Sequence, residues 1–297
     1  MLVTGGTVFV SRYVAEYYAM KGYELYVLNR NTRPQSAGVR LIQADRHALG
    51  EKLRGQHFDV VVDTAYTAND VELLLDALES YDKYILISSS SVYPESAPQP
   101  FAEETELGPN KYWGKYGTDK IEAEAALTVR DPGAYILRPP YLYGPMNNVY
   151  REAFVFEFAL KDRKFYLPRS GELKLQFFHV DDLCRFMEMI ISGVEQHIFN
   201  LGNKDAVSVR EWVELCYRAA GKQAEFVNVF ADVEQRNYFS FYDYEYYLDV
   251  TKQYELLPDT KPLYDGLKEA FEWYRDNSDK VVRKPYMEYI DGNLLLQ

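Results

Sequence analysis

Leu2-Val-Thr-Gly-Gly-Thr-Val-Phe-Val-Ser11 opens the chain with a short apolar run, two glycines and the start of an amphipathic segment. This is the order of a strand, a tight turn and a helix. The same order continues to about residue 140, with apolar runs at 25–28, 41–42, 60–62, 84–87 and 134–137. Strands separated by helices of this length form right-handed βαβ units. The sequence therefore predicts an α/β fold with a doubly wound parallel sheet.

Charge and composition exclude several classes of protein. Lysine and arginine number 33 against 45 aspartate and glutamate residues, and this formal net charge of −12 gives no overall attraction to nucleic acid or an anionic membrane. No apolar run approaches the ~18 residues of a membrane span, and the N-terminus lacks a secretory pattern. Cys184 and Cys216 fall in apolar helical patterns, which predicts buried, reduced thiols. We therefore expect a cytoplasmic protein with small-molecule or protein partners.

A tyrosine and a lysine one helical turn apart, Tyr116-Gly-Thr-Asp-Lys120, follow an apolar run that ends in four serines at 88–91. The run predicts a buried strand with hydroxyls at its end, and the spacing puts Tyr116 and Lys120 on one helix face. A phenol with a pKa near ~10 needs a neighbouring cation to favour its ionised form at neutral pH. A serine hydroxyl can then bind the substrate oxygen whose proton Tyr116 transfers. This set of groups suits hydride transfer at a hydroxyl or carbonyl carbon.

These residues resemble the Ser-Tyr-Lys constellation of the short-chain dehydrogenase/reductase superfamily, and specifically its extended branch, the NAD(P)-dependent epimerase/dehydratase family. In that branch the catalytic serine or threonine stands three residues before a Val-Tyr pair, which selects Ser89 here. The resemblance covers about residues 1–215 and implies catalytic roles for Ser89, Tyr116 and Lys120. It also implies that Lys120 holds the cofactor ribose, and that a homodimer forms through the helix that carries Tyr116.

The alternation of strands and helices loosens near residue 145, where long aromatic and charged segments begin. We expect residues 1–145 to form a dinucleotide-binding Rossmann domain that includes the catalytic motif. Residues 146–297 are expected to form mainly a smaller α/β substrate lobe, with segments that cross back to the Rossmann domain.

The glycine turn resembles a dinucleotide-binding fingerprint, in which glycines let the backbone approach a pyrophosphate at a helix N-terminus. The extended family usually has Thr-Gly-Gly-x-Gly-Phe-Ile-Gly, so Gly5 and Gly6 match while Val8 and Ser11 replace two glycines. A side chain at position 8 would point toward the phosphates or open the turn, and one at position 11 would push the helix from the strand. Retained binding is the favoured interpretation, and a turn that has lost its ligand is the alternative. The residues of the turn expected to contact the cofactor are Gly5, Gly6, Thr7, Phe9 and Val10.

Asn29-Arg30 and Arg33 follow the second predicted strand, where an NAD-preferring enzyme usually offers a carboxylate to the ribose. Two guanidiniums in that place favour NADP slightly over NAD, although both arginines can equally belong to a solvated loop. By position within the resemblance, two further groups of residues are expected beside the cofactor, namely Asp45 with Arg46, and Thr64 with Ala65. The alternative for Asp45 is a cap of the segment that begins at His47.

The serines after Ser89 bear on the reaction. Sugar dehydratases of the family carry Asp-Glu after the catalytic threonine, whereas this chain has Ser90-Ser91, so dehydration is disfavoured against an epimerase or a reductase. Tyr141 and Leu175 replace an asparagine and an arginine that commonly support nucleotide-sugar substrates. A sugar-like substrate is still expected, and the residues predicted to contact it are Ser90, Tyr141, Tyr143 and His179.

His179-Val-Asp-Asp182 resembles another segment of the family, and we interpret its aspartates mainly as N-terminal caps of the helix that follows. The four histidines have no metal-ligand spacing, so no metal is expected. The aromatic stretch 238–247 can line a substrate pocket, but local core or a subunit contact is the favoured interpretation.

Two other functions use the same fold. The glycine turn and the 179–182 segment also resemble the chloroplast stem-loop RNA-binding relatives, although the acidic charge argues against nucleic acid. A catalytically inactive regulatory protein is the third hypothesis, and the intact Ser89, Tyr116 and Lys120 are hard to reconcile with it.

Overall fold

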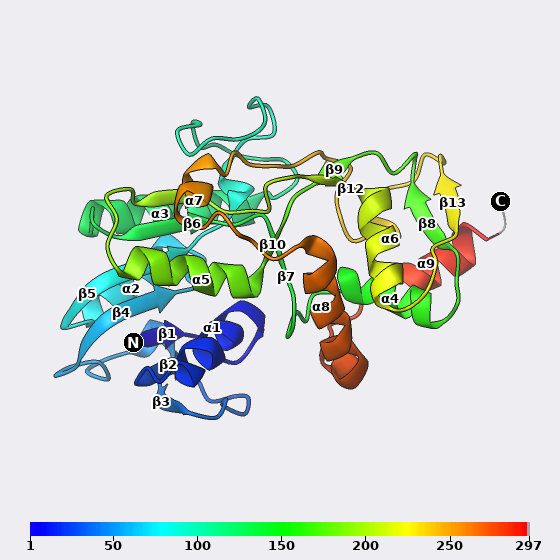
Figure 1. Cartoon of the computed structure of the whole chain (residues 1–297). Coiled ribbons are helices and arrows are strands. Elements are labelled where there is room, and N and C mark those ends of the chain that lie inside the picture. Colours follow the sequence, from blue (N-terminus) through cyan, green and yellow to red (C-terminus); the bar gives the residue numbers. More distant parts are fainter. Residues whose placement is uncertain (296–297) are drawn as a thin grey trace.

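Seven parallel strands form the central sheet of the computed structural model, which describes residues 1–295 (Figure 1). Across the sheet they are β11 (Ile198–Asn200), β6 (Tyr135–Arg138), β5 (Ser80–Ile87), β4 (His57–Asp63), β1 (Leu2–Thr4), β2 (Leu25–Asn29) and β3 (Val39–Gln43). The doubly wound parallel sheet predicted from the sequence is confirmed. The strand order reverses between β1 and β4, and ligands bind outside the carboxyl ends of strands at such a point.

Helices cover both faces of the sheet. On one face α1 (Phe9–Met20) and α5 (Val180–Ile191) pack together, and on the other face α2 (Ala68–Ala77) and α3 (Lys115–Arg130) do so. Each face has its own apolar core, because the strands are buried on both sides and their residues alternate between the two cores. The helix predicted around Tyr116 is confirmed as α3.

A smaller lobe lies beside the sheet domain, at the right of Figure 1. Its helices are α4 (Glu152–Leu160), α6 (Val209–Ala219), α8 (Leu263–Asn277) and α9 (Tyr286–Asn293). Its strands form three pairs, β7 (Tyr141–Tyr143) with β10 (Phe177–His179), β8 (Phe165–Pro168) with β13 (Phe226–Val229), and β9 (Lys174–Leu175) with β12 (Val207–Ser208). The core of the lobe is rich in aromatic side chains, and α4 is apolar around most of its circumference because it is buried there.

The chain returns to the sheet domain after residue 145. α5 packs on α1, and β11 forms the edge of the sheet beside β6. The remaining elements are α7 (Thr251–Leu256) and the 3₁₀ turns η1 (Arg46–Ala48), η2 (Ser90–Val92), η3 (Gln235–Asn237) and η4 (Ser278–Lys280). Within residues 1–295, no helix is long and apolar enough to cross a membrane. Cys184 and Cys216 are free and buried, as predicted.

Candidate active site

A cavity of about 470 Å³ lies between the sheet domain and the smaller lobe, and we call it the tyrosine cavity. Ser89 and Ser90, which follow β5, line it together with Tyr116 of α3 and Tyr141 of β7. The lobe contributes residues Asn148, Val149, Tyr150, Arg151, Arg236, Ser240, Tyr242, Tyr246, Val282, Lys284 and Tyr286. The structure therefore brings Ser89 and Tyr116 to one cavity, whereas Lys120 does not belong to its lining.

The serines after β5 have separate hydrogen-bond partners. Ser88 donates to the buried carboxylate of Glu124, and Ser90 donates to the Pro139 carbonyl (3.0 Å) and accepts from the Tyr246 hydroxyl. Ser89 caps the 3₁₀ turn η2, where its Oγ accepts from the Ser91 N–H (3.2 Å). That bond does not use the Ser89 hydroxyl hydrogen, and the hydroxyl, which lines the cavity together with Tyr116, lowers the pKa of the phenol.

Opposing influences act on the Tyr116 phenol. Although 39% of the residue surface is exposed, surrounding protein atoms desolvate the phenol and raise its pKa. The hydrogen bond from Ser89 and the positive charge of Arg151 act in the other direction, whereas the neighbouring Tyr66 adds to the rise. Desolvation prevails, so Tyr116 is a protonated phenol at neutral pH in this structure.

Lys120 is buried, with 3% of its surface exposed, and its ammonium points away from solvent. It donates to the carbonyls of Ala65 (2.6 Å) and Ile87 (3.0 Å) and lies 5.0 Å from the centre of the Tyr66 ring. Burial lowers its pKa to about 8, against the attraction of Asp63 and other nearby carboxylates. The ammonium thus links the segment after β4 to the end of β5. The positive charge that lowers the Tyr116 pKa is that of Arg151.

A second cavity of about 410 Å³ lies at the carboxyl ends of β1, β2 and β4, where the strand order reverses, and we call it the glycine-turn cavity. Seven of the residues predicted to contact a cofactor line it, namely Gly5, Asn29, Arg30, Asp45, Arg46, Thr64 and Ala65. Tyr66 also lines this cavity, and its ring centre is 6.0 Å from that of Tyr116 in the tyrosine cavity. The two cavities therefore adjoin at this pair of rings.

The glycine turn keeps a backbone path that only glycine tolerates well. Gly5 and Gly6 have positive φ angles of 85° and 79°, and a Cβ on Gly6 would come within 2.5 Å of Val27. Val8 is the N-cap residue of α1 and makes no side-chain capping bond, and Ser11 donates to its carbonyl (3.1 Å). A Cβ on Gly5 would approach the Ser11 hydroxyl to 2.9 Å, so Ser11 fills the space beside the turn.

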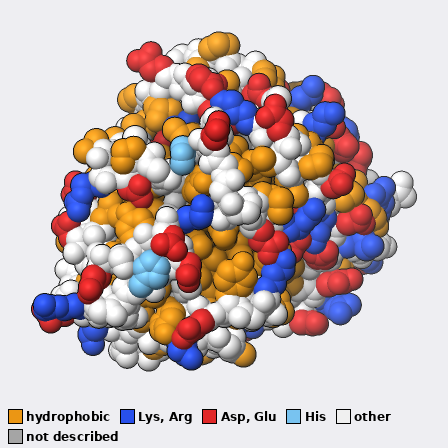
Figure 2. Space-filling model, turned by 60° about the vertical axis from the view of Figure 1, so that its left-hand side comes forward, with side chains coloured by type: hydrophobic (Ala, Val, Ile, Leu, Met, Phe, Trp, Pro, Cys, Tyr) orange, Lys and Arg blue, Asp and Glu red, His pale blue; other side chains and the backbone are white. Residues whose placement is uncertain are grey.

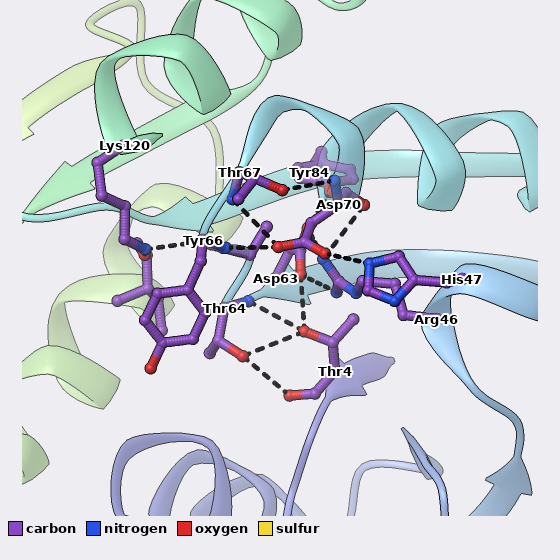
Figure 3. A network of polar contacts seen from close by, with 12 residues as sticks. Thr4, Arg46, His47, Asp63, Thr64, Tyr66, Thr67, Asp70, Tyr84 and Lys120 are labelled. Carbon is purple, nitrogen blue, oxygen red and sulfur yellow. Dashed lines mark hydrogen bonds and ion pairs between the residues drawn. The ribbon is translucent and has the colours of Figure 1, made fainter. Parts of the chain in front are cut away.

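Arg46, which lines the glycine-turn cavity, forms an ion pair with Asp63 (Figure 3). Asp63 is fully buried and also accepts from the hydroxyls of Thr4 (2.7 Å) and Tyr84 (2.5 Å), which ties β1, β4 and β5 together. Arg46 is thus engaged by the protein. Asp45 accepts from the His47 N–H (2.9 Å) and caps η1, as its alternative interpretation expected.

The family follows from the sequence match together with this arrangement. The sequence matches the NAD dependent epimerase/dehydratase family over residues 1–73 and 66–202, more than half of the chain. The chain belongs to this family.

Named relatives of this epimerase/dehydratase family member include proteins of different activities. The chloroplast stem-loop binding protein of 41 kDa b of Arabidopsis thaliana is 26% identical over 300 residues, 91% of this chain and 78% of that protein. Probable GDP-L-fucose synthase 1 of Oryza sativa subsp. japonica is 26% identical over 256 residues, 76% of this chain and 74% of that protein. The solved UDP-glucuronic acid 4-epimerase of Bacillus cereus, in complex with UDP-glucuronic acid and NAD, has a TM-score of 0.72 and 20% identity. That match covers 93% of this chain and 98% of the epimerase chain, and it shows the shared fold.

Some predicted site residues of this epimerase/dehydratase family member lie away from both cavities. Gly6, Thr7, Val10 and Arg33 are outside the lining of either cavity, and Phe9 is buried in the apolar core under α1. Tyr143 and His179 are also buried, with ring centres 5.1 Å apart. Burial lowers the His179 pKa to about 3, so the imidazole is neutral.

The prediction that the aspartates after His179 cap α5 is wrong. His179 itself is the cap, because its Nδ1 accepts from the Asp181 N–H (3.2 Å), and Asp181 and Asp182 lie in the first turn. Asp182 instead accepts from the backbone N–H of Lys261 (2.7 Å) and pairs with Arg185 (2.7 Å). It therefore joins α5 to the segment that leads into α8.

The tyrosine cavity contains residues that sequence reasoning missed. Arg151, Arg236 and Lys284 line it, and each lies in a segment without a recognisable motif. In the aromatic stretch, Phe239 and Phe241 belong to the core of the lobe as the favoured interpretation expected. Its members Tyr242 and Tyr246 also line the cavity, which was the alternative.

Proposed function

We propose that this member of the family is an NAD(P)-dependent epimerase or reductase that acts at a hydroxyl or carbonyl carbon of a sugar-like substrate. The observation that carries the proposal is the meeting of the two cavities at Tyr66 and Tyr116, with Ser89 beside the Tyr116 phenol. A substrate in the tyrosine cavity would face a dinucleotide in the glycine-turn cavity across this junction. Hydride transfer requires that proximity, because the two reacting carbons must be held a few ångströms apart.

The residues of the glycine-turn cavity fit a dinucleotide. Gly5 lines this cavity without a side chain, and the first N–H groups of α1 have no partner within the helix, so they can bind a pyrophosphate. Asn29 would lie beside the adenosine ribose at the end of β2. When bound, the nicotinamide would supply the acceptor or donor of the hydride.

Two arginines support a preference for NADP over NAD. Arg30 and Arg33 are exposed near the end of β2, and within residues 1–295 neither guanidinium has an ion-pair partner. Arg30 lines the glycine-turn cavity, where it would be available to a 2′-phosphate.

Tyr116 would transfer the proton. Because desolvation raises its pKa, the protonated phenol is poised to donate to a carbonyl oxygen, and the reverse reaction returns the proton to the phenolate. Ser89 would hold the same oxygen, since its hydroxyl already interacts with the phenol. Lys120 uses two of its donors on the Ala65 and Ile87 carbonyls, and the third remains for the cofactor ribose.

The test is calorimetric titration of the purified protein with NAD and NADP, followed by turnover assays with a panel of nucleotide sugars. We expect a dissociation constant in the micromolar range for at least one dinucleotide, with NADP bound more tightly. Absence of binding by both at millimolar concentration would exclude the enzymatic proposal.

The stem-loop binding relative supplies a second candidate function, RNA binding on the same fold. The net charge of −12 opposes it, and Figure 2 shows basic side chains dispersed among acidic ones on the face that it displays. Binding of a stem-loop RNA at 50 and 200 mM salt tests this candidate, because phosphate contacts make affinity fall steeply with salt.

A further inference from the structure

Three cationic side chains line the tyrosine cavity, in a chain whose net charge is −12. They are Arg151 at the start of α4, Arg236 in η3 and Lys284 before α9. No aspartate or glutamate belongs to the described lining of this cavity. The positive charge therefore has no compensating carboxylate on the cavity wall.

Arg151 stands out among these cations because the protein leaves it unpaired. Its Nε is buried and has no hydrogen-bond partner, and its guanidinium has no ion-pair partner within residues 1–295. The adjacent carboxylate of Glu152 is bound instead by the side chain of Asn147 (2.7 Å). The guanidinium carbon lies 5.4 Å from the centre of the Tyr141 ring, which faces the same cavity.

An unpaired guanidinium in this position destabilises the folded protein. Arg151 is half-buried, and partial removal of its guanidinium from water without a contacting carboxylate costs free energy. This desolvation lowers the pKa of Arg151, while the charge of the neighbouring Glu152 acts in the opposite direction. A purely structural arginine would be paired, as Arg138 is with the buried Glu124 (2.6 Å). Arg151 therefore has the properties of a group whose partner is a ligand.

The other two cations differ in how free they are. Arg236 donates to the Ser240 carbonyl, and its guanidinium carbon lies 4.8 Å from the centre of the Tyr242 ring. One of its hydrogen-bond donor groups is therefore already occupied. Lys284 is exposed, and within the described part of the chain it has no ion-pair partner. Both can add attraction for an anion, while Arg151 offers the desolvated donors.

We propose that Arg151, supported by Arg236 and Lys284, forms an oxyanion subsite beside Tyr116, so that the substrate carries a carboxylate or phosphate near its reacting carbon. This subsite rests on the proposed function, because it assigns the tyrosine cavity to the substrate. A guanidinium binds either anion with two parallel hydrogen bonds, and a desolvated wall strengthens them. The aromatic rings around it, including Trp113 and Tyr242, would cover the apolar faces of a sugar.

The test compares three probes by calorimetry, UDP-glucuronic acid, UDP-glucose and UDP, on the wild-type chain and on Arg151→Gln. Glutamine keeps a hydrogen-bonding side chain but removes the charge, and we expect it to weaken binding of the anionic probe about 10- to 100-fold. A loss confined to UDP-glucuronic acid supports the subsite, because only this probe carries an anionic group on the sugar. An equal loss for all three probes would place Arg151 at the diphosphate, away from the reacting carbon, and would overturn the proposal.

Unchanged affinity for all three probes in Arg151→Gln would overturn the proposal, and so would failure of the wild-type chain to bind any of them at millimolar concentration. Arg54→Gln is the matched control, since Arg54 is exposed, pairs with Glu51 and lies outside both cavities. It removes the same charge and should leave probe affinity unchanged. Lys284→Gln, at an exposed position that does not endanger folding, should weaken binding about two- to fivefold.

Thermal unfolding distinguishes a ligand-binding arginine from a structural one. Without ligand, Arg151→Gln should melt at the same or a higher temperature than the wild-type chain, because a partly desolvated charge without an ion-pair partner is removed. A lower melting temperature with unchanged probe affinity would make Arg151 structural. The dinucleotide titration is independent of these results, so a chain that binds no dinucleotide but loses probe binding in Arg151→Gln would keep the subsite and lose the proposed oxidoreductase activity.

Discussion

Tyr116 owes its proposed chemistry to the balance of its neighbours. Burial in the cavity wall raises its pKa, while the Ser89 hydroxyl and the Arg151 guanidinium stabilise the phenolate. Because desolvation prevails, Tyr116 holds its proton at neutral pH and can donate it to a substrate oxygen. Because these neighbours act on the Tyr116 hydroxyl, removal of that hydroxyl group is the most direct test of its role.

Tyr116→Phe should lower kcat by about 10²- to 10⁴-fold, the usual contribution of a positioned acid or base. Dinucleotide affinity should stay within about twofold, because the glycine-turn cavity does not include Tyr116. Steady-state kinetics and calorimetry on the same preparation measure both effects. Tyr81→Phe is the matched control, since the Tyr81 hydroxyl bonds Asp131 (3.0 Å) and lies outside both cavities. Turnover by Tyr116→Phe at the wild-type rate would remove Tyr116 from the mechanism.

Local order in the sequence predicted serine hydroxyls at the end of an apolar strand and a tyrosine on the next helix, and the family resemblance selected Ser89 among the four serines. The structure brings Ser89 and Tyr116 to one cavity. Sequence reasoning could not locate Arg151, which reaches the cavity only because the lobe folds over the sheet domain. The direction of the Lys120 ammonium was equally hidden, because i,i+4 spacing fixes a helix face but not which carbonyls a long side chain meets.

At the scale of the elements, the start of α1 departs from its family pattern. Val8 occupies the N-cap position with extended backbone angles, φ −137° and ψ 135°, and makes no capping hydrogen bond. Valine is among the poorest N-cap residues, whereas glycine is tolerated there. Its branched side chain is half-buried and packs against the apolar core on that face of the sheet. Val8 directly precedes the first N–H groups of the helix, which are the donors that a pyrophosphate would use.

Val8→Gly should therefore raise dinucleotide affinity about three- to tenfold, at a cost in stability of about 1 kcal/mol because the half-buried side chain no longer packs against the core. Calorimetry with NADP and thermal melts measure the two effects. Val10→Gly provides the comparison, because Val10 lies inside α1, where glycine costs about 1 kcal/mol and opens no donor. Equal affinity of Val8→Gly and the wild-type chain would show that Val8 does not obstruct the turn.

A buried ion pair anchors α3, the helix that carries Tyr116, to the central sheet. Glu124 of α3 meets Arg138 of β6 through two nitrogens, and both side chains are at least 96% buried, with 4% and 3% of their surface exposed. Arg138 also donates to the Tyr93 hydroxyl (2.9 Å), which in turn donates to Asn200 of β11 (2.7 Å). The network fixes α3 relative to β5, β6 and β11.

Glu124→Gln should lower the free energy of unfolding by about 3–5 kcal/mol, because the Arg138 guanidinium stays buried without its carboxylate. Urea denaturation measures the loss. The double variant Glu124→Leu with Arg138→Met should recover most of it, since apolar side chains of similar volume replace both charges. Greater loss in the double variant than in Glu124→Gln would contradict this account of the pair.

At the scale of the whole molecule, the topology of the sheet domain and the presence of a smaller lobe were predictable, but the internal arrangement of the lobe was not. Buried parallel strands are recognisable in the sequence as apolar runs. The amphipathic helices between them indicate right-handed βαβ units, which determine the topology of the sheet. The lobe is held instead by strand pairs of two to four residues, such as β9 with β12 and β8 with β13, which join segments far apart in the sequence. Pairings that short carry no periodic signal, so the position of the aromatic stretch against the cavity had to come from the structure.

The 27 tyrosines of the chain predict how its stability depends on pH. Burial raises the pKa of many of them, strongly so for Tyr18, Tyr84, Tyr143 and Tyr246. A tyrosine whose pKa is raised by folding contributes fully to the free energy of unfolding below its pKa in the unfolded chain, ~10. This contribution is lost as the pH rises further. At pH 11 each such tyrosine would cost about 1.4 kcal/mol, so four cost about 6 kcal/mol, comparable with the whole stability of an ordinary domain.

We expect the chain to unfold cooperatively between about pH 10 and pH 11.5, with no loss from these groups below pH 10. Lys120 has the opposite effect on stability, because burial lowers its pKa to about 8 in the folded protein. The free energy of unfolding therefore rises as the pH increases from 8 toward the pKa of lysine in the unfolded chain, ~10.4. Phenolate absorbance near 295 nm from the buried tyrosines and far-UV circular dichroism should therefore change together. Complete phenolate formation while the helical signal persists would contradict the burial of these phenols, since their ionisation requires water that the folded core excludes.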